Sequence, residues 1–374
     1  MSKNLNKVTI CKRCVSNTTI PGFEVNENDC NYCELHDKFN EQYPIDQNTL
    51  DVMIEQIKKD GHGKQYDCII GISGGCDSSY LLYKAVEWGL KPLTVHYNNS
   101  WNSKIANSNM DKILTELKVH TVWTIIDSKE VNDIWRSFLR AGVPDIEAPT
   151  DIALATVAYK AADEYNIKYI LNGHSFRTEG IAPLGVSYMD GKYIEDVHKK
   201  FGSEDMVTFP NLWLSNWIKW IFKGIKRVRP LYYIDYNKEE AKKVLNSKFG
   251  WEWYNHHHGD NEFTAFFRNY YRNKICGIDS RLTEYSALIR SGQMERNEAL
   301  KLLEKPLEFD GDLEAVRNRL NMTKDEWDIS MKYPTRTHND FKNYKSTFKK
   351  LKPLFWLAYK RELIPKTFYM KYCK

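Results

Sequence analysis

The 374-residue sequence contains no long uninterrupted run of hydrophobic residues. Its longest apolar cluster, Leu212–Phe222, is interrupted by Ser215, Asn216 and Lys219 and is too short to cross a bilayer. Such a cluster is more typical of buried core than of a surface that touches a membrane or a partner. No apolar signal segment follows the first residue, so we expect a cytoplasmic protein without a transmembrane segment.

A strong excess of one charge is also missing. Lys and Arg together number 54 and Asp and Glu 49, which leaves a net charge of +5. This mild excess favours anionic small molecules, but it falls short of the basic surface of a strong polyanion binder. We therefore expect no stable complex with nucleic acid. The length is sufficient for one large α/β core with one or two smaller modules.

Cysteine is sparse, with eight in the chain, but four of the eight are regularly spaced. Cys11 and Cys14 form one Cys-x-x-Cys pair, and Cys30 and Cys33 form a second. In a chain without a secretory signal, this pattern favours a metal site over disulfides. Four thiolates suit a tetrahedral, purely structural Zn²⁺ ion best, and the alternatives are a redox dithiol pair and an iron–sulfur cluster. We predict a zinc ribbon.

The sequence has no Gly-Lys-Ser/Thr, which excludes a Walker A loop, but it has another glycine turn. The apolar run Cys68–Ile72 leads directly into Ser-Gly-Gly-Cys-Asp-Ser at residues 73–78. Glycine lets the backbone approach an anion, and the N–H groups that open the next helix point at that anion. The motif resembles SGGxDS, the PP-loop of the ATP pyrophosphatases, which bind ATP, adenylate a substrate oxygen and release pyrophosphate. The alternative is a plain turn of small residues.

Short apolar strands alternate with amphipathic helices after this turn, which predicts an α/β fold with a parallel sheet covered on both faces. We divide the chain into a zinc ribbon (1–43), a PP-loop ATP pyrophosphatase domain (44–236) and a helical C-terminal region that binds substrate and partner (237–374). The predicted strands are 68–72, 93–96, 122–126 and 169–171, and the predicted helices of the core are 44–59, 78–89, 105–117, 134–139 and 152–162.

Two further turns follow strands at the sheet edge where ligands bind. The first is the turn 96–101, which His96 starts and whose alternative role is only to end a strand and cap a helix. The second is the turn 173–180, which contains His174 and Arg177. Arg177 can neutralise phosphate charge during adenylation, and His174 can donate to the phosphates. Asp77 either holds Mg²⁺ or fixes the loop through backbone N–H groups. We predict catalytic roles for Asp77, His174 and Arg177, and cofactor binding by Ser73, Gly74, Gly75, Asp77, Ser78, His96 and Gly173.

Most of the chain is similar to the bacterial N-acetyl sugar amidotransferases, a PP-loop family of surface-glycan biosynthesis. The resemblance rests on the paired cysteines, the loop 73–78, the turns 96–101 and 173–180, and the C-terminal blocks 262–264 and 289–294. It implies that ATP with Mg²⁺ adenylates the acetamido oxygen of a nucleotide-activated N-acetyl sugar. Ammonia then displaces AMP and leaves an acetamidino group, in the biosynthesis of LPS and O-antigen, capsule or flagellin glycan.

The ammonia source is not visible in this sequence. Residue 2 is Ser, and no Gly-x-Cys-x-Gly elbow of a class I glutaminase occurs. The resemblance therefore implies a separate glutaminase, with a barrel-like cyclase homologue as the ammonia conduit.

One C-terminal block departs from the family. His257-His258-Gly259-Asp260-Asn261 stands where the family has a Lys-His-x-Glu-Ser stretch before Phe-Thr. We expect His257, His258 and Asp260 to bind the sugar, and a polar loop is the alternative. A metal site made of consecutive histidines is disfavoured, because neighbouring side chains point in different directions.

Two other functions compete with this interpretation. A PP-loop enzyme that thiolates tRNA would use Cys76 or Cys68 in sulfur transfer, but the modest charge and the lack of a recognisable RNA-binding module argue against it. A zinc-ribbon scaffold with an inactive loop would have no affinity for ATP, and the complete loop motif argues against that.

Overall fold

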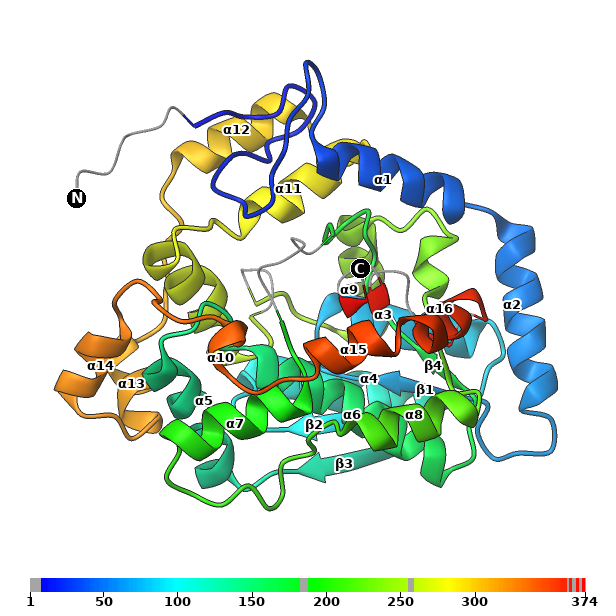
Figure 1. Ribbon diagram of the computed structural model, residues 1–374. Coiled ribbons are helices and arrows are strands. Elements are labelled where there is room, and N and C mark those ends of the chain that lie inside the picture. The colour runs from blue at the N-terminus through cyan, green and yellow to red at the C-terminus, as the bar shows by residue number, and fades with distance from the viewer. Residues whose placement is uncertain are drawn as a thin grey trace.

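The computed structural model describes residues 8–181, 188–254 and 259–361, together with residues 363, 364, 368, 369, 372 and 373. Five parallel strands form one sheet in the order β3-β2-β1-β4-β5 (Figure 1). β1 is the central strand, and the chain passes from β3 to β4 on the other side of it. The topological switch point, where ligands bind in such sheets, therefore lies between β1 and β4. The strands are β1 (Cys68–Gly71), β2 (Pro92–Asn98), β3 (Thr121–Ile125), β4 (Tyr169–Leu171) and β5 (Lys226–Val228).

Helices make up most of the rest of the described chain. The helices of the first two-thirds are α1 (Asn31–Gln42), α2 (Gln47–Asp60), α3 (Cys76–Glu87), α4 (Lys104–Leu117), α5 (Ser128–Ala141), α6 (Ala148–Glu164), α7 (Gly191–Phe201), α8 (Leu214–Phe222) and α9 (Lys238–Phe249). Those that follow are α10 (Glu262–Phe266), α11 (Arg281–Arg290), α12 (Arg296–Glu304), α13 (Leu313–Arg319), α14 (Lys324–Ser330), α15 (Lys345–Lys350) and α16 (Lys352–Lys360). Short 3₁₀ turns are η1 (Pro230–Tyr232) and η3 (His338–Asp340), and η2 (Phe267–Ile275) is a π-helix.

Alternate side chains of each central strand belong to two different hydrophobic cores. Ile69 and Ile170 pack with residues of α5, α6 and α7. Ile70 and Leu171 pack with residues of α2, α3, α4 and α9. Both faces of the sheet are therefore covered, which explains why its strands are apolar without a polar side. This confirms the predicted α/β fold with a parallel sheet. The predicted strands and core helices are all present, β4 with the predicted bounds and the others with shifted ends.

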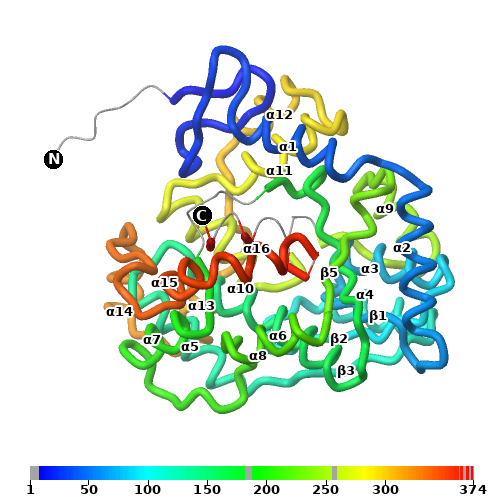
Figure 2. The backbone as a smooth tube through the Cα atoms, turned by 45° about the vertical axis from the view of Figure 1, so that its right-hand side comes forward, coloured from blue at the N-terminus to red at the C-terminus, as the bar shows by residue number. Residues whose placement is uncertain are grey.

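The N-terminal cysteine segment packs against α11 and α12 of the C-terminal region, away from the sheet (Figures 1 and 2). Figures 1 and 2 both show α1, α11 and α12 side by side above the core. Arg296 of α12 donates to the carbonyl groups of Cys14 and Cys11, with N–O distances of 3.0 and 2.9 Å. The hydroxyl groups of Ser16 and Ser286 are 2.9 Å apart. Segments about 270 positions apart in the sequence thus build one part of the structure.

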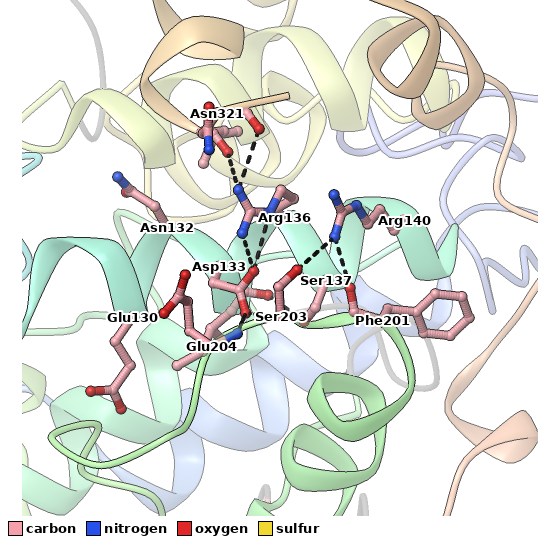
Figure 3. A network of polar contacts seen from close by, with 12 residues as sticks. Glu130, Asn132, Asp133, Arg136, Ser137, Arg140, Phe201, Ser203, Glu204 and Asn321 are labelled. Carbon is pink, nitrogen blue, oxygen red and sulfur yellow. Dashed lines mark hydrogen bonds and ion pairs between the residues drawn. The ribbon is translucent and has the colours of Figure 1, made fainter. Parts of the chain in front are cut away.

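A buried polar network joins the C-terminal region to the sheet layer at α5 (Figure 3). The Asp133 carboxylate accepts hydrogen bonds from the backbone N–H groups of Ser203 and Glu204 at 2.7 and 2.9 Å. Arg136 contacts Asp133 and donates to the carbonyl group of Asn321 at 3.3 Å. Burial raises the pKa of Asp133, but its hydrogen-bond donors outweigh burial and lower that pKa below its usual value.

None of the helices in the described part of the chain is long and apolar enough to cross a membrane. The apolar cluster singled out in the sequence forms α8, in which Trp217 and Trp220 are buried and Phe222 is exposed.

Candidate functional site

The four regularly spaced cysteines converge on one point. Cys11, Cys14, Cys30 and Cys33 are buried, and their sulfur atoms all lie within 4.8 Å of one another. The recorded Sγ–Sγ distances are 3.6 to 3.9 Å, far beyond a disulfide bond. Sulfur ligands at about 2.3 Å from a tetrahedral Zn²⁺ ion would be about 3.8 Å apart. The donor set and its spacing therefore fit a closed, structural zinc site.

Arg290, at the end of α11, is a neighbour of the cysteine cluster that the sequence pattern did not reveal. Its guanidinium donates to the sulfur atoms of Cys33 and Cys14, with N–S distances of 3.3 and 3.1 Å, and reaches Cys30 at 3.7 Å. A site of four thiolates and one divalent cation has a net negative charge, which a buried guanidinium offsets. Arg290 thus fits the role of an outer ligand that ties α11 to the metal site.

The loop 73–78 connects β1 to α3 in a compact turn. The hydroxyl groups of Ser73 and Ser78 are 3.2 Å apart, and the backbone N–H of Gly75 donates to the Ser73 hydroxyl at 3.2 Å. Gly74 has a φ of 79°, and a Cβ at this position would lie 2.1 Å from the carbonyl oxygen of Ala106. Only glycine is compatible with both the backbone conformation and the close packing on α4. The helix that follows begins at Cys76, two residues before the predicted start.

Neighbouring elements hold this loop in place. The carbonyl group of Gly74 accepts a hydrogen bond from the indole N–H of Trp251 at 3.0 Å. A Cβ added to Gly173 would lie 2.8 Å from the carbonyl oxygen of Asp77, so the turn after β4 is packed directly on the loop. The turns after β1 and β4 therefore meet at the switch point, as the sequence predicted for residues at this edge.

Asp77 is bound by two side chains from the segment around α9. One carboxylate oxygen accepts a hydrogen bond from the Tyr236 hydroxyl at 2.7 Å, and the other lies 3.0 Å from Nζ of Lys238. Burial lowers the pKa of Lys238, but attraction from Asp77 and Glu179 outweighs it and raises that pKa above its usual value. Asp77 thus has protein partners on both oxygens. These contacts favour the loop-fixing role, with side chains in place of the expected backbone N–H groups.

His174 extends the network of charged groups that Asp77 and Lys238 form. Its Nε2 atom lies 3.8 Å from Glu179, whose other oxygen lies 3.9 Å from Lys238. Its Nδ1 atom is 3.3 Å from the Tyr232 hydroxyl. Burial lowers the pKa of His174, although Glu179 opposes this effect. The imidazole is therefore neutral at pH 7 and can accept a proton.

Arg177 lies in the same turn, but its guanidinium is buried against protein groups. It donates to the carbonyl oxygens of Tyr232 and Tyr43 at 2.6 and 2.7 Å, and to the Asn40 side chain at 2.9 Å. The structure thus uses Arg177 to hold the end of α1 against the turn. Its predicted catalytic role remains a prediction.

His96 joins the end of β2 to the residue before the loop. Its Nδ1 atom lies 2.6 Å from the Ile72 carbonyl oxygen, and its Nε2 atom lies 3.0 Å from the Asn102 side-chain nitrogen. Burial lowers the pKa of His96. The structure places this residue behind the loop, as a support for the turn 96–101.

The C-terminal block that differs from the family pattern contains Asp260, and this residue lies beside the loop 73–78. A Cβ added to Gly75 would lie 3.3 Å from a carboxylate oxygen of Asp260 and 3.3 Å from the Tyr254 hydroxyl. The Asp260 carbonyl group accepts a hydrogen bond from the backbone N–H of Ser103 at 2.9 Å. Asp260 is therefore brought to the phosphate loop, whereas His257 and His258 lie outside the described residues.

A cavity of about 420 Å³ opens beside the loop on the side of β2. Arg319 stacks on Trp101 with 3.9 Å between the guanidinium carbon and the ring centre, and it pairs with Glu262 at 2.8 Å. Carboxylates outnumber cations in the lining, so the cavity suits an uncharged ligand group that can hydrogen-bond. Its lining is Trp101, Ser103, Ile105, Tyr254, Gly259, Glu262, Ala265, Phe309, Asp310, Gly311, Asp312, Ala315, Val316 and Arg319.

The two cysteines that a sulfur-transfer enzyme would use are buried. Burial raises the pKa of the Cys76 thiol to about 12, and it raises the pKa of Cys68 well above its usual value. Neither thiol is ionised near neutral pH, which is unfavourable for a nucleophile.

Among the comparisons with known proteins, the match to a family model lies in the C-terminal region. Residues 260–354 match the family model described as "LPS biosynthesis protein WbpG-like, C-terminal domain". A comparison with curated proteins gives no match. Among solved structures, the chain is similar to NMN synthetase from Francisella tularensis, with 15% identity and a TM-score of 0.27, over 61% of this chain and 96% of that chain.

The fold of the core follows from its own sheet order and phosphate loop, which are those expected of a PP-loop protein. The matched C-terminal region begins at Asp260, beside that loop, and supplies much of the cavity lining. Residues 260–354 therefore resemble the C-terminal domain of WbpG-like LPS biosynthesis proteins, and they adjoin a parallel α/β core whose loop 73–78 resembles a PP-loop.

Proposed function

We propose that this protein is an ATP-dependent amidotransferase that converts the acetamido group of a nucleotide-activated N-acetyl sugar into an acetamidino group. The observation that carries the proposal is the position of Asp260. This residue opens the region matched to LPS biosynthesis proteins and lies beside Gly75 of the phosphate loop. A glycan-related domain and an ATP-binding loop thus share one site, which supports a reaction between ATP and a sugar.

The chemistry has two steps. The acetamido oxygen attacks the α-phosphorus of ATP, the bond to the bridging oxygen breaks, and pyrophosphate leaves. Ammonia then adds to the imidate carbon, the carbon–oxygen bond to AMP breaks, and the excess proton is released. Adenylation is needed because an amide oxygen is a poor leaving group, whereas AMP is a good one.

The loop would bind the phosphates of ATP through backbone N–H groups and the hydroxyls of Ser73 and Ser78. Mg²⁺ that enters with ATP would offset the charge of the leaving pyrophosphate. The phosphates themselves would hold the ion, whereas Asp77, whose two oxygens are bound by Tyr236 and Lys238, would fix the loop. The cavity on the β2 side would take the nucleoside of ATP, because its carboxylates repel phosphates and its polar groups suit ribose and base.

His174 is proposed as the group that takes up the proton released when ammonia adds. Its depressed pKa leaves the ring nitrogen free to accept at neutral pH, and Glu179 stabilises the imidazolium that forms. Arg177 would act in catalysis only indirectly, by holding the turn that carries His174. His257, His258 and Asp260 remain the predicted contacts to the sugar.

Ammonia would come from a separate glutaminase with a cyclase-like channel subunit, as the family resemblance implies. Outside the four-cysteine cluster, burial raises the pKa of every described cysteine, so none is suited to act as a glutaminase nucleophile: these are Cys68, Cys76, Cys276 and Cys373.

The direct test uses purified protein with ATP, Mg²⁺, an ammonium salt and a panel of UDP- and CMP-linked N-acetyl sugars. Mass spectrometry should show a sugar that has exchanged an oxygen atom for an NH group, formed together with AMP and pyrophosphate. AMP formed only in the presence of tRNA, with every sugar unchanged, would contradict the proposal and favour tRNA thiolation.

A further inference from the structure

Two arginines lie in β5 and directly after it, on the opposite side of β1 from the cavity. Arg227 is in β5, and Arg229 follows the end of this strand. Residues two apart in a strand point to the same side, so the two guanidinium groups share one side of the sheet. The backbone N–H of Asn172 donates to the Val228 carbonyl group at 2.9 Å, which places Arg229 beside the turn that carries His174.

Neither guanidinium has a carboxylate partner within ion-pair distance among the described residues. Nε of Arg229 is buried and has no hydrogen-bond partner there. Its guanidinium carbon lies 5.5 Å from the ring centre of Tyr232. The two least exposed arginines of the described residues have full sets of acceptors: Arg177 donates to three acceptors, and Arg136 to a carboxylate and two carbonyl groups.

The two cations also repel each other. Burial lowers the pKa of Arg227, and an interaction with Tyr159 opposes this effect. Repulsion from Arg229 lowers the pKa further, and attraction to Asp151 is weaker than that repulsion. Both arginines lower the pKa of His174, so they lie within electrostatic reach of it. Adjacent cations that are half-buried and have no carboxylate partner are unfavourable in a free protein. Such an arrangement is stable at a functional site when a bound anion supplies the missing charge.

We propose that Arg227 and Arg229 bind the phosphate of the nucleotide that carries the acceptor sugar. Guanidinium groups bind phosphate oxygens through paired N–H donors, and two of them match a diphosphate. The phosphates of ATP have their own loop after β1, and the cavity for its nucleoside lies towards β2. The β4–β5 side of the switch point is therefore left for the second substrate. This inference rests on the proposed function, since it names where that substrate is held.

The experiment measures the binding of UDP, CMP and α,β-methylene ATP by calorimetry, to the wild-type protein and to R227Q, R229Q and the double variant. Each single variant should bind UDP about tenfold more weakly, because a charge-assisted hydrogen bond is lost. The affinity for α,β-methylene ATP should not change. The control is K226Q, which removes a cation of the same strand from the other side of the sheet and should bind UDP as the wild type does.

A thermal unfolding measurement adds a readout that does not depend on binding. Without ligand, R227Q should unfold at the same temperature as the wild type or higher, because an unpaired cation is removed. UDP should stabilise the wild type much more than the double variant. If a glutamine variant fails to fold, R227K and R229K keep the charge and should fold, yet they should still bind UDP more weakly because the paired donors are lost.

The outcomes separate this inference from the proposed function. Unchanged UDP and CMP affinity in the double variant would overturn the arginine site, even if sugar amidination is observed. A loss of α,β-methylene ATP binding without a loss of UDP binding would assign the arginines to ATP and would also overturn it. Arginine-dependent binding of CMP in place of UDP would support the site and identify a monophosphate carrier. Arginine-dependent binding without amidination of any sugar would leave this site in place and refute the proposed reaction.

Discussion

Nζ of Lys238 lies 3.0 Å from a carboxylate oxygen of Asp77, in the first turn of the helix that follows the phosphate loop. The same ammonium group lies 3.9 Å from Glu179, which faces His174. One buried cation thus connects the loop after β1 with the turn after β4. The Asp77 carboxylate, which would repel phosphate, is neutralised and held in place. In the proposed function, this network fixes the arrangement of charge at the site before ATP binds.

Lys238→Met should therefore lower both the stability of the protein and the activity that depends on the loop 73–78. It leaves Asp77 without its cation, and removal of one partner of a buried pair typically costs about 3 kcal/mol. Urea denaturation should show this loss, and pyrophosphate release should fall strongly. The matched control is K243M, whose ion pair with Glu240 is exposed and should contribute little. If the K238M variant had wild-type stability and wild-type pyrophosphate release, the network would have no functional role.

Cys30→Ser should destroy the metal site before it affects the loop. Three remaining thiolates cannot close a tetrahedral sulfur site, so zinc content should drop and the cysteine segment should lose its fold. Metal analysis and limited proteolysis of residues 8–43 measure both effects. The control C68S changes a buried cysteine outside the cluster and should retain zinc. Equal zinc content in C30S and the wild type would rule out the four-cysteine site.

Arg290→Leu tests the outer contact of the same centre. The guanidinium donates to two cysteine sulfurs at 3.3 Å or less, so its loss should weaken zinc binding about 10- to 100-fold. Zinc transfer to a chromogenic chelator gives the affinity. Arg281→Leu is a suitable control, because Arg281 lies at the other end of α11 and pairs with Asp279. An unchanged zinc affinity in R290L would show that the arginine only packs against the cluster.

The pH profile of the reaction should report His174. Its pKa is lowered by burial, so the neutral base persists below the usual histidine pKa of about 6.5, and activity should fall only as pH decreases through the lowered value. The same sign applies to stability: folding disfavours the charged ring, so stability contributed by neutral His174 is lost as pH falls below the unfolded pKa. The H174Q variant should lose most activity at every pH, and its remaining activity should no longer fall as the pH becomes acidic. An acid limb that persists unchanged in H174Q would assign the base to another residue.

Cys76→Ala should leave amidination near the wild-type rate. The thiol is buried, its pKa is raised to about 12, and it contacts Tyr236 and the Lys238 carbonyl group rather than open space. Steady-state assays of AMP formation provide the comparison. Complete loss of activity in a folded C76A protein would favour sulfur chemistry.

The sequence was sufficient for the features that depend on local patterns. The apolar runs predicted the strands, the spacing of cysteines predicted their convergence, and the glycine motif predicted the compact turn between β1 and α3. It was not sufficient for β5, because Lys226 and Arg227 hide a short edge strand from any hydrophobic pattern. The exact helix ends were missed as well, since α3 begins inside the loop motif.

Contacts between residues that are distant in the sequence could not be predicted from it either. Lys238 binds a carboxylate 161 positions earlier in the sequence (238 − 77), and Arg290 contacts Cys14 across 276 positions. Nothing local marks either residue, although Arg290 belongs to a block that resembled the family. Asp260 was singled out from the sequence, but its place beside Gly75 depends on how its segment packs on the turn after β2.

The central claim is that ATP activates the acetamido oxygen of a sugar, and an oxygen isotope label on that group tests it most directly. The protein is incubated with ATP, Mg²⁺, an ammonium salt and the labelled nucleotide sugar, and the AMP is analysed by mass spectrometry. The account predicts that the label moves from the sugar into the phosphate of AMP, because the bond from that oxygen to carbon is the one that breaks. Unlabelled AMP, or ADP and phosphate in place of AMP and pyrophosphate, would contradict it.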